Sequence, residues 1–223
     1  LVPGHTSIDH EWFKASAKYE RNEYTDRYIW TDNTWSLPGN TAYLRGMYAR
    51  DGVAVANYFS HQPALNYGYA HPDKSWKMSA DSPAALSTRE TIKDVMRFWL
   101  DLGTDGFRVD MALKLVKDDD EGRPANIRLW QDFRAFLDKE YPHCAMVSEW
   151  GVPKESIAGG FHMDFMLHFG PPAYTSLFRG ETPFFSKEGK GDITAFLDTY
   201  SAMLASTEGK GLICIPSGNH DMP

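Results

Sequence analysis

Short strand-like runs alternate with amphipathic helical stretches in the second half of the chain, and this alternation constrains the fold more than any other feature. Strands are expected over 106–112, 144–150, 163–169 and 212–216, where apolar residues cluster. Between these runs, apolar residues recur at helical spacing. Strands and helices that alternate along a chain form a parallel sheet, either doubly wound or closed into a barrel.

Helices are expected before and between these strands, and capping residues indicate where they begin and end. Ser87 and Glu90 form the Ser-x-x-Glu pattern of a capping box, and Gly103 suits the end of that helix. A second helix is expected over 127–139, and Asp192 is expected to cap a third. Each helix carries an apolar face, and we expect that of the second helix to be buried. These faces carry Ile92, Val95, Met96, Trp99 and Leu100; Leu129, Trp130, Phe133, Phe136 and Leu137; and Ile193, Phe196, Leu197, Tyr200, Met203 and Leu204.

Polar residues follow the expected strands at the positions where the active site of a barrel would lie. Asp110 follows the first strand core, Glu149 the second, and the pair His220 and Asp221 the last. In α/β barrels, functional side chains lie at the carboxyl ends of strands. The sequence contains neither glycine signature of nucleotide-binding sheets, G-x-G-x-x-G or G-x-x-x-x-G-K-[ST]. We therefore expect a barrel and not a doubly wound sheet.

Arg108 and Asp110 lie two residues apart and therefore point to the same face of their strand. One interpretation is a buried ion pair that only fixes the fold. The other is an active site, because Glu149 and Asp221 supply further carboxyls at other strand ends. Glu149 precedes Trp150, and an apolar indole favours the protonated carboxyl that a general acid requires. Several carboxyls beside an arginine suit glycoside hydrolysis, which uses one carboxyl as nucleophile and another as acid/base.

The segment from 6 to 66 lacks this alternation. It is rich in Asn, Asp, Gly, Tyr and Trp, and only short periodic pieces occur in it. A long irregular segment inside a compact domain is either functional or a small subdomain. Its aromatic side chains either stack on sugar rings or pack within the subdomain. The candidates are Trp12, Trp30, Trp35 and Tyr43.

Charge and composition argue against some classes of partner. The net charge is −7 over 223 residues and lysines and arginines do not cluster, which disfavours nucleic acid. No apolar run reaches the length of a membrane span, so no membrane partner is expected. Cys144 and Cys214 lie in apolar runs and are expected to be buried thiols. No signal peptide is visible, and nothing in the sequence indicates a compartment.

Five short motifs together resemble those of the α-amylase superfamily, glycoside hydrolase family 13. DGFRVD (105–110), VSEW (147–150) and SGNHD (217–221) are similar to its second, third and fourth conserved regions. LVPGHTS (1–7) is similar to the first region, and HQPALN (61–66) to the fifth. The motifs occur in the family's order along the whole chain. The resemblance implies an α/β fold, a partial (β/α)8 TIM barrel from about strand 3 to strand 7.

The resemblance also implies two domains. Residues 1–5 and 67–223 are expected to form the partial catalytic barrel, and residues 6–66 the irregular domain B that the family inserts after strand 3. A complete barrel takes about 250 residues or more. We therefore expect the chain to be a piece of a longer protein, whose remaining strands and any C-terminal domain lie outside it.

The positions of the motifs assign catalytic roles by resemblance. Asp110 is the expected nucleophile, Glu149 the acid/base and Asp221 the stabiliser of the transition state. Arg108 is expected to orient Asp110. Inactive paralogues of such enzymes typically lose a catalytic carboxylate, and all three are present here.

Substrate-binding roles follow from the same resemblance. His5 and His220 match the two histidines that hydrogen-bond the glucose unit at the cleaved bond, and Trp150 either contacts the leaving group or packs in the core. The expected substrate is a starch-type α-glucan or a malto- or isomalto-oligosaccharide, cleaved through a covalent glycosyl-enzyme intermediate. One alternative is a transglycosylase or a trehalose-synthase-like glucan isomerase of the same superfamily. Another is an inactive carbohydrate-binding or partner-subunit paralogue.

No cofactor is expected, and two departures argue against the structural calcium of the family. Gly4 stands where the first region carries an asparagine ligand, and Leu113 and Lys114 stand where the second region often carries Lys-His, whose histidine backbone is another ligand. Calcium requires roughly six to eight oxygen ligands, so we predict that this calcium is absent. A calcium elsewhere is an alternative, for example at KDDDEG (117–122), which otherwise forms a solvated loop. Ala64 replaces the aspartate of the fifth region, so the sequence does not predict substrate length or linkage.

Overall fold

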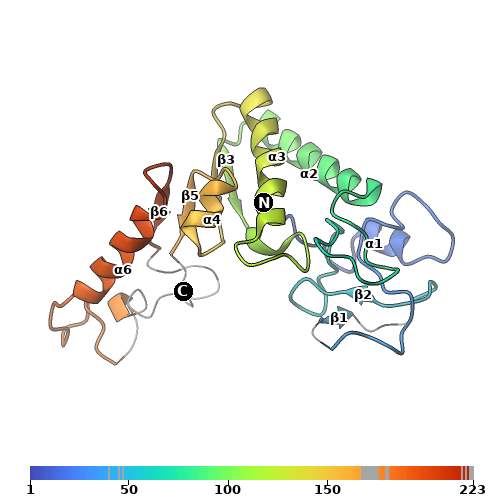
Figure 1. Cartoon of the computed structure of the whole chain (residues 1–223), viewed down its shortest axis with the longest axis horizontal. Coiled ribbons are helices and arrows are strands. Elements are labelled where there is room, and N and C mark those ends of the chain that lie inside the picture. The colour runs from blue at the N-terminus through green and yellow to red at the C-terminus, as the bar shows by residue number, and fades with distance from the viewer. Residues whose placement is uncertain are drawn as a thin grey trace. The chain divides into compact units, whose positions relative to one another are not determined.

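The computed structural model of the chain describes residues 1–39, 41–44, 46, 48–166, 176–178, 181–216, 218 and 220. The chain divides into two compact units (Figure 1). Unit 1 comprises Leu1–Thr104 and Asp110–Leu129, and unit 2 comprises Asp105–Val109 and Trp130–Pro223. None of the helices in the described residues is both long and apolar enough to cross a bilayer. The expected domain B over 6–66 stays a prediction.

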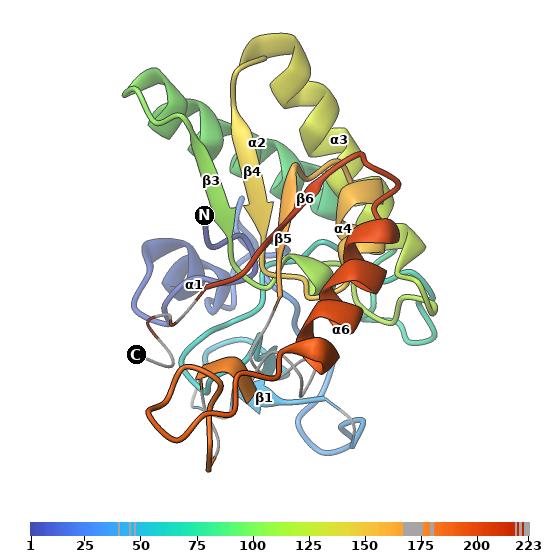
Figure 2. The same cartoon turned by 90° about the vertical axis from the view of Figure 1, so that its left-hand side faces the viewer.

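Unit 2 is built on a parallel sheet whose strands lie side by side in Figure 2. Within the described residues, the order of the strands in the sheet is also their order along the chain. Each strand lies within one of the runs expected from the sequence, so the parallel sheet is confirmed. The strands are β3 (Gly106–Val109), β4 (Ala145–Ser148), β5 (Met163–Phe165) and β6 (Leu212–Cys214).

The strands are shorter than expected, and β3 shows the reason. Phe107 and Val109 are buried while Arg108 is half-buried, which is the alternation that the sequence predicts. The alternation stops before Met111, whose φ of 41° lies in the left-handed region and cannot continue a strand. The start of β3 requires glycine, because a Cβ on Gly106 would lie 2.1 Å from the carbonyl oxygen of Ala145.

Helices α3 (Pro124–Glu140), α4 (Pro153–Ala158) and α6 (Thr194–Ala205) accompany the sheet. α3 begins in unit 1 and continues in unit 2. The expected buried face of α3 is confirmed, with every one of its five apolar side chains buried. In unit 2, α4 packs beside β5 and α6 beside β6 (Figure 2). The sequence analysis missed α4, because six residues are too few for helical periodicity to be recognised.

One residue of α6 departs from its predicted face. Phe196, Tyr200 and their neighbours pack against Met166 and Ile213, as the spacing predicts. Leu197 was also assigned to this face, but it is 45 % exposed. The prediction was wrong because Leu197 lies at the margin of the apolar stripe, where the stripe no longer faces the sheet.

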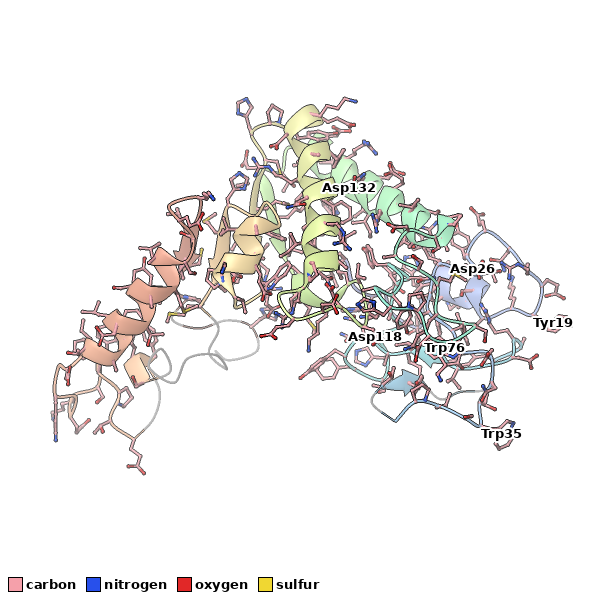
Figure 3. All side chains as sticks on the ribbon, in the orientation of Figure 1. Tyr19, Asp26, Trp35, Trp76, Asp118 and Asp132 are labelled. Atoms are coloured by element: carbon pink, nitrogen blue, oxygen red, sulfur yellow. The ribbon has the colours of Figure 1, made fainter. Side chains whose placement is uncertain are left out.

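Unit 1 has little regular structure before its long helix. Its elements are α1 (Glu11–Ser16), the antiparallel pair β1 (Tyr43–Leu44) and β2 (Ala54–Val55), α2 (Pro83–Asp101) and the short 3-10 helix η1 (Ala112–Lys114). Aromatic packing holds the irregular part together, since Phe13 stacks on Trp30 at 5.6 Å. The packing alternative is therefore confirmed for Trp30. Trp35 is 94 % exposed, and Figure 3 shows it pointing away from the rest of unit 1.

Helix α2 begins one turn earlier than the capping box predicts. Its N-cap is Ser82, whose hydroxyl accepts a hydrogen bond from the Ala85 amide at 3.3 Å, and Pro83 follows at the first helical position. Ser87 therefore lies inside the helix, and its prediction as N-cap was wrong. Of the apolar residues at helical spacing, Ile92 and Met96 are buried, whereas Trp99 is 49 % exposed.

Candidate active site

Asp110 follows β3 directly and is held at its backbone by the first residue of the chain. Its amide donates a hydrogen bond to the carbonyl oxygen of Leu1 at 2.9 Å, and its side chain is half-buried. The next residue, Met111, has the left-handed φ of 41° and leads into η1. A left-handed backbone at a large side chain costs on the order of 1 kcal/mol and is common beside functional residues. The backbone thus reverses immediately after the predicted nucleophile.

His5 lies in the same unit as Asp110 and is electrostatically coupled to it. The backbone of His5 pairs with Ala64, and its Nδ1 lies 3.1 Å from the side-chain nitrogen of Asn57. Burial lowers the pKa of His5, and the Asp110 carboxylate opposes that shift. His61 and Lys117 add positive charge that lowers the pKa of His5 further. The charge of the expected nucleophile, Asp110, therefore acts on His5, which the resemblance assigns to glucose binding.

The residues of unit 1 do not fit the calcium site that the resemblance implies. The Nζ of Lys117 donates a hydrogen bond to the carbonyl oxygen of Lys114 at 2.7 Å, so an ammonium group already contacts that expected ligand. At the other expected ligand position, a Cβ on Gly4 would lie 3.0 Å from the amide nitrogen of Asn57. The Asn57 side chain therefore fills the space that an asparagine at position 4 would need.

The acidic loop 117–122 uses its carboxylates in separate contacts. Asp118 forms an ion pair with Lys77 at 2.5 Å, and Asp120 contacts His71 at 3.0 Å. Asp119 accepts hydrogen bonds from the Ala125 and Asn126 amides at 3.1 and 2.9 Å, which caps the first turn of α3. The ammonium group of Lys77 also lies 5.8 Å from the centroid of the Trp76 ring, and Asp118 and Trp76 are labelled in Figure 3. No group of three metal-ligating side chains occurs in the parts of the chain that the structure describes.

Glu149 follows β4 and lies in unit 2 with Arg108. Its amide donates to the carbonyl oxygen of Val109 at 2.9 Å, which extends the pairing of β3 and β4 by one step. Its side chain is 13 % exposed and forms an ion pair with Arg108 at 3.0 Å. The Arg108 guanidinium also lies over the ring of Phe165, 5.9 Å from its centroid. Arg108 was predicted as the partner of Asp110, and its contact with Glu149 is an addition that the sequence did not suggest.

Trp150 is a packed residue of unit 2. Its side chain is 2 % exposed, its ring contacts that of Phe161, and its Nε1 donates to the carboxylate of Glu155 at 2.9 Å. This burial supports the packing alternative for Trp150 over contact with a leaving group.

The last predicted motif is only partly described. His220 is exposed, and Asp221 lies outside the described residues. Within unit 2, the structure thus pairs Arg108 with Glu149, and within unit 1 the Asp110 carboxylate raises the pKa of His5 against the effect of burial.

Sequence reasoning missed two charged residues beside these pairs. Lys117 was treated only as part of an acidic loop. Asp164 lies in the middle of an apolar strand and is fully buried, and an acidic residue inside such a run was a signal that the sequence analysis did not use.

The whole chain, residues 1–223, matches the family described as alpha amylase, catalytic domain. A trehalose synthase/amylase TreS of Mycolicibacterium smegmatis is 32% identical over 183 residues, which cover 77% of this chain and 27% of the relative. An alpha-amylase 3 of Dictyoglomus thermophilum is 32% identical over 149 residues, which cover 67% of this chain and 25% of the relative. The chain therefore spans about a quarter of the length of these curated relatives.

Solved structures share the fold at lower identity. An alpha-glucosyl transfer enzyme, XgtA, superposes with a TM-score of 0.69 at 22% identity and covers 99% of this chain and 43% of its own. The trehalose-6-phosphate hydrolase of Bacillus licheniformis superposes with a TM-score of 0.66 at 21% identity, covering 100% of this chain and 41% of its own. The parallel sheet and helices of unit 2 are consistent with part of the α/β barrel of these proteins. The chain belongs to the alpha-amylase catalytic-domain family of glycoside hydrolase family 13.

Proposed function

We propose that this chain supplies catalytic residues of a retaining enzyme that acts on α-glucosidic bonds of starch-type glucans or oligosaccharides. The observation that carries the proposal is the register of β3 and β4. Val109 pairs with Ser148, and the residues that directly follow this pair are Asp110 and Glu149. Parallel strands place their carboxyl ends at one edge of a sheet, which is where barrel enzymes carry their catalytic side chains. Membership of the family supports the same assignment.

The proposed reaction has two displacements at one carbon. Asp110 attacks the anomeric carbon, the bond to the leaving oxygen breaks, and Glu149 donates a proton to that oxygen. Water or a sugar hydroxyl then attacks the glycosyl-enzyme bond, Glu149 takes the proton of the attacking group, and the Asp110 carboxylate is released. Asp221 is assigned to stabilising the transition state, and His5 and His220 to binding the glucose unit.

The contact with Arg108 fixes the position of the Glu149 carboxyl. The guanidinium orients Glu149 through a charge-assisted contact at 3.0 Å. The low exposure of the carboxyl limits its contact with water, which strengthens this interaction. The same geometry serves both half-reactions, because Glu149 is the acid in the first and the base in the second.

Hydrolysis and transfer share the covalent intermediate and differ in the group that attacks it. Relatives named as trehalose synthase/amylase and as an alpha-glucosyl transfer enzyme make transfer the second candidate. In the proposed fold, β3 to β6 correspond to part of strands four to seven of the barrel, and residues 6–66 to domain B. We also propose that the family's conserved calcium is absent, because Lys117 and Asn57 occupy the positions described above.

The first test replaces Glu149 with glutamine in the full-length protein. Glu149→Gln keeps the size of the side chain but removes the ionisable carboxyl group, so turnover of maltose should fall by about 10²–10⁴-fold. The measurement is the release of glucose or of transfer product under saturating substrate. Added azide, which needs no general base, should restore the second displacement in this variant when α-glucosyl fluoride is the donor.

The matched control is Glu121→Gln, which neutralises an exposed carboxyl in the acidic loop and should leave turnover unchanged. Wild-type turnover in Glu149→Gln would remove Glu149 from the acid/base role. Binding of maltooligosaccharides without cleavage or transfer by the wild-type protein would instead support the inactive, carbohydrate-binding alternative.

A further inference from the structure

Asp164 is an ionisable residue in the centre of unit 2 that no step of the proposed reaction uses. It lies in β5, it is 0 % exposed, and its register partner in β4 is Ser148. An isolated buried carboxylate is costly unless hydrogen bonds compensate for the lost water. The contacts of Asp164 therefore indicate what keeps it in this position.

One oxygen of Asp164 binds the turn that carries Glu149 from both sides. Oδ1 accepts hydrogen bonds from the hydroxyl of Ser148 at 2.7 Å, from the Trp150 amide at 3.0 Å and from the Gly151 amide at 3.2 Å. Ser148 directly precedes Glu149, and Trp150 and Gly151 directly follow it. The Asp164 carboxylate thus forms hydrogen bonds with the residues on both sides of Glu149.

The surrounding contacts leave this turn little freedom. The Ser148 hydroxyl proton is directed to Asp164, so the Ser156 hydroxyl donates to Ser148 Oγ at 2.6 Å. Gly151, whose amide donates to the carboxylate, has a φ of 79° in the left-handed region that favours glycine. The Trp150 indole is fixed independently through Glu155.

The surroundings of Asp164 are those of a side chain that accepts hydrogen bonds and has a structural role. Burial raises the pKa of Asp164, and the hydrogen bonds from Ser148, Gly151 and Trp150 act in the opposite direction. Backbone amides can only donate, so Oδ1 must remain an acceptor while the turn is formed. The turn and the carboxylate therefore stabilise each other.

We propose that Asp164 is a positioning residue that fixes the backbone on both sides of Glu149, so that the Glu149 carboxyl is held where it protonates the leaving oxygen. The inference rests on the proposed role of Glu149. It predicts that Asp164 affects the step that needs an acid more than the binding of substrate, because a displacement of about 1 Å at a catalytic group costs about 10²-fold in rate.

The test compares two donors in the full-length protein. Maltose needs protonation of its leaving oxygen, whereas fluoride leaves from α-glucosyl fluoride with little help. With azide as the attacking group, so that the second displacement needs no general base, Asp164→Ala should lower kcat for maltose by about 10²-fold, with a much smaller loss for α-glucosyl fluoride and little change in KM. Asp164→Asn keeps an acceptor at Oδ1 and should recover most of the loss for maltose.

The control is Asp138→Asn, which removes an exposed carboxylate of unit 2 that pairs with Arg134, and it should leave both donors unaffected. Equal losses for both donors in Asp164→Ala, or no loss, would overturn the inference. If Asp164→Ala does not fold, the same comparison is made with Asp164→Asn and Ser148→Ala. The inference requires these variants to lose activity on maltose, by a smaller factor, and not on α-glucosyl fluoride.

The proposed function fails in a distinguishable way. Full activity of Glu149→Gln would refute the role of Glu149 and, with it, this inference. Inactivity of the wild-type protein on both donors would do the same. Loss of activity in Glu149→Gln together with equal losses for both donors in Asp164→Ala would refute only the role of Asp164.

Discussion

Lys117 illustrates how the surroundings of one side chain change its ionisation. Burial lowers the pKa of Lys117 to about 8, the positive charge of Lys114 acts in the same direction, and Asp118 opposes it. Its Nζ nevertheless donates to the Lys114 carbonyl. A lysine that loses its proton near neutral pH can keep this hydrogen bond, because a neutral amine also donates.

The lowered pKa predicts a pH dependence of stability with a definite sign. Between about pH 8 and the ordinary lysine value near 10.4, the unfolded chain binds more protons than the folded chain. The contribution of Lys117 to the free energy of unfolding therefore rises with pH across this window. Because Lys117 is half-buried and solvent weakens the effect, we expect a rise of about 1–3 kcal/mol.

Lys117→Met removes this contribution. The difference in free energy of unfolding between the wild-type protein and Lys117→Met should grow from pH 8 to pH 10, as measured by urea denaturation. Subtracting the variant cancels the titration of the tyrosines, whose pKa values are raised in the folded state. A difference that is constant over this range would show that Lys117 titrates as an exposed lysine.

At the scale of elements, substitution of the two serines near the start of α2 tests which of them caps the helix. Ser82→Ala removes the acceptor of the Ala85 amide and should lower the free energy of unfolding by about 1 kcal/mol. Ser87→Ala is the matched control inside the helix and should cost less than about 0.5 kcal/mol. Denaturant unfolding followed by circular dichroism measures both. A larger loss for Ser87→Ala would restore the capping box expected from the sequence.

The elements that the sequence predicts well are those with a strong local period. Strands β3 to β6 and most of α2, α3 and α6 follow from apolar spacing alone. The exposure of Trp99 and Leu197 could not be predicted, because periodicity identifies an apolar stripe but not the neighbours that cover it.

The candidate site shows the same limit at a smaller scale. Asp110 and Glu149 could be recognised because each follows a strand and lies in a motif. The partner of Arg108 and the role of Asp164 could not, because they depend on the register between strands far apart in the sequence. A shift of register by one residue would place different side chains opposite each other.

At the scale of the whole molecule, calcium provides the remaining test. The conserved calcium of the family would stabilise the folded protein by mass action, so its removal would lower the melting temperature. We expect EDTA, and millimolar calcium added back after dialysis, to leave the melting temperature unchanged. The physical reason is that Lys117 donates to the carbonyl of one expected ligand, Lys114, and that Asn57 lies against Gly4, which replaces the other.

A fall in melting temperature with EDTA would contradict this prediction unless it arose in the acidic loop. The double variant Asp118→Asn and Asp120→Asn separates the two cases. An effect that disappears in the double variant would locate the calcium in the loop, whereas a persistent effect would locate it elsewhere.

The parallel sheet of unit 2 also determines whether its two thiols can form a disulfide with each other. Cys144 is buried just before β4, and Cys214 ends β6, with β5 between these strands. Strands two places apart in a sheet are separated by roughly 9–10 Å, beyond the reach of about 7 Å between the Cα atoms of a disulfide. Oxidation therefore cannot join Cys144 to Cys214 in a disulfide while the sheet is intact. We expect the fold of unit 2 to be the same under oxidising and reducing conditions.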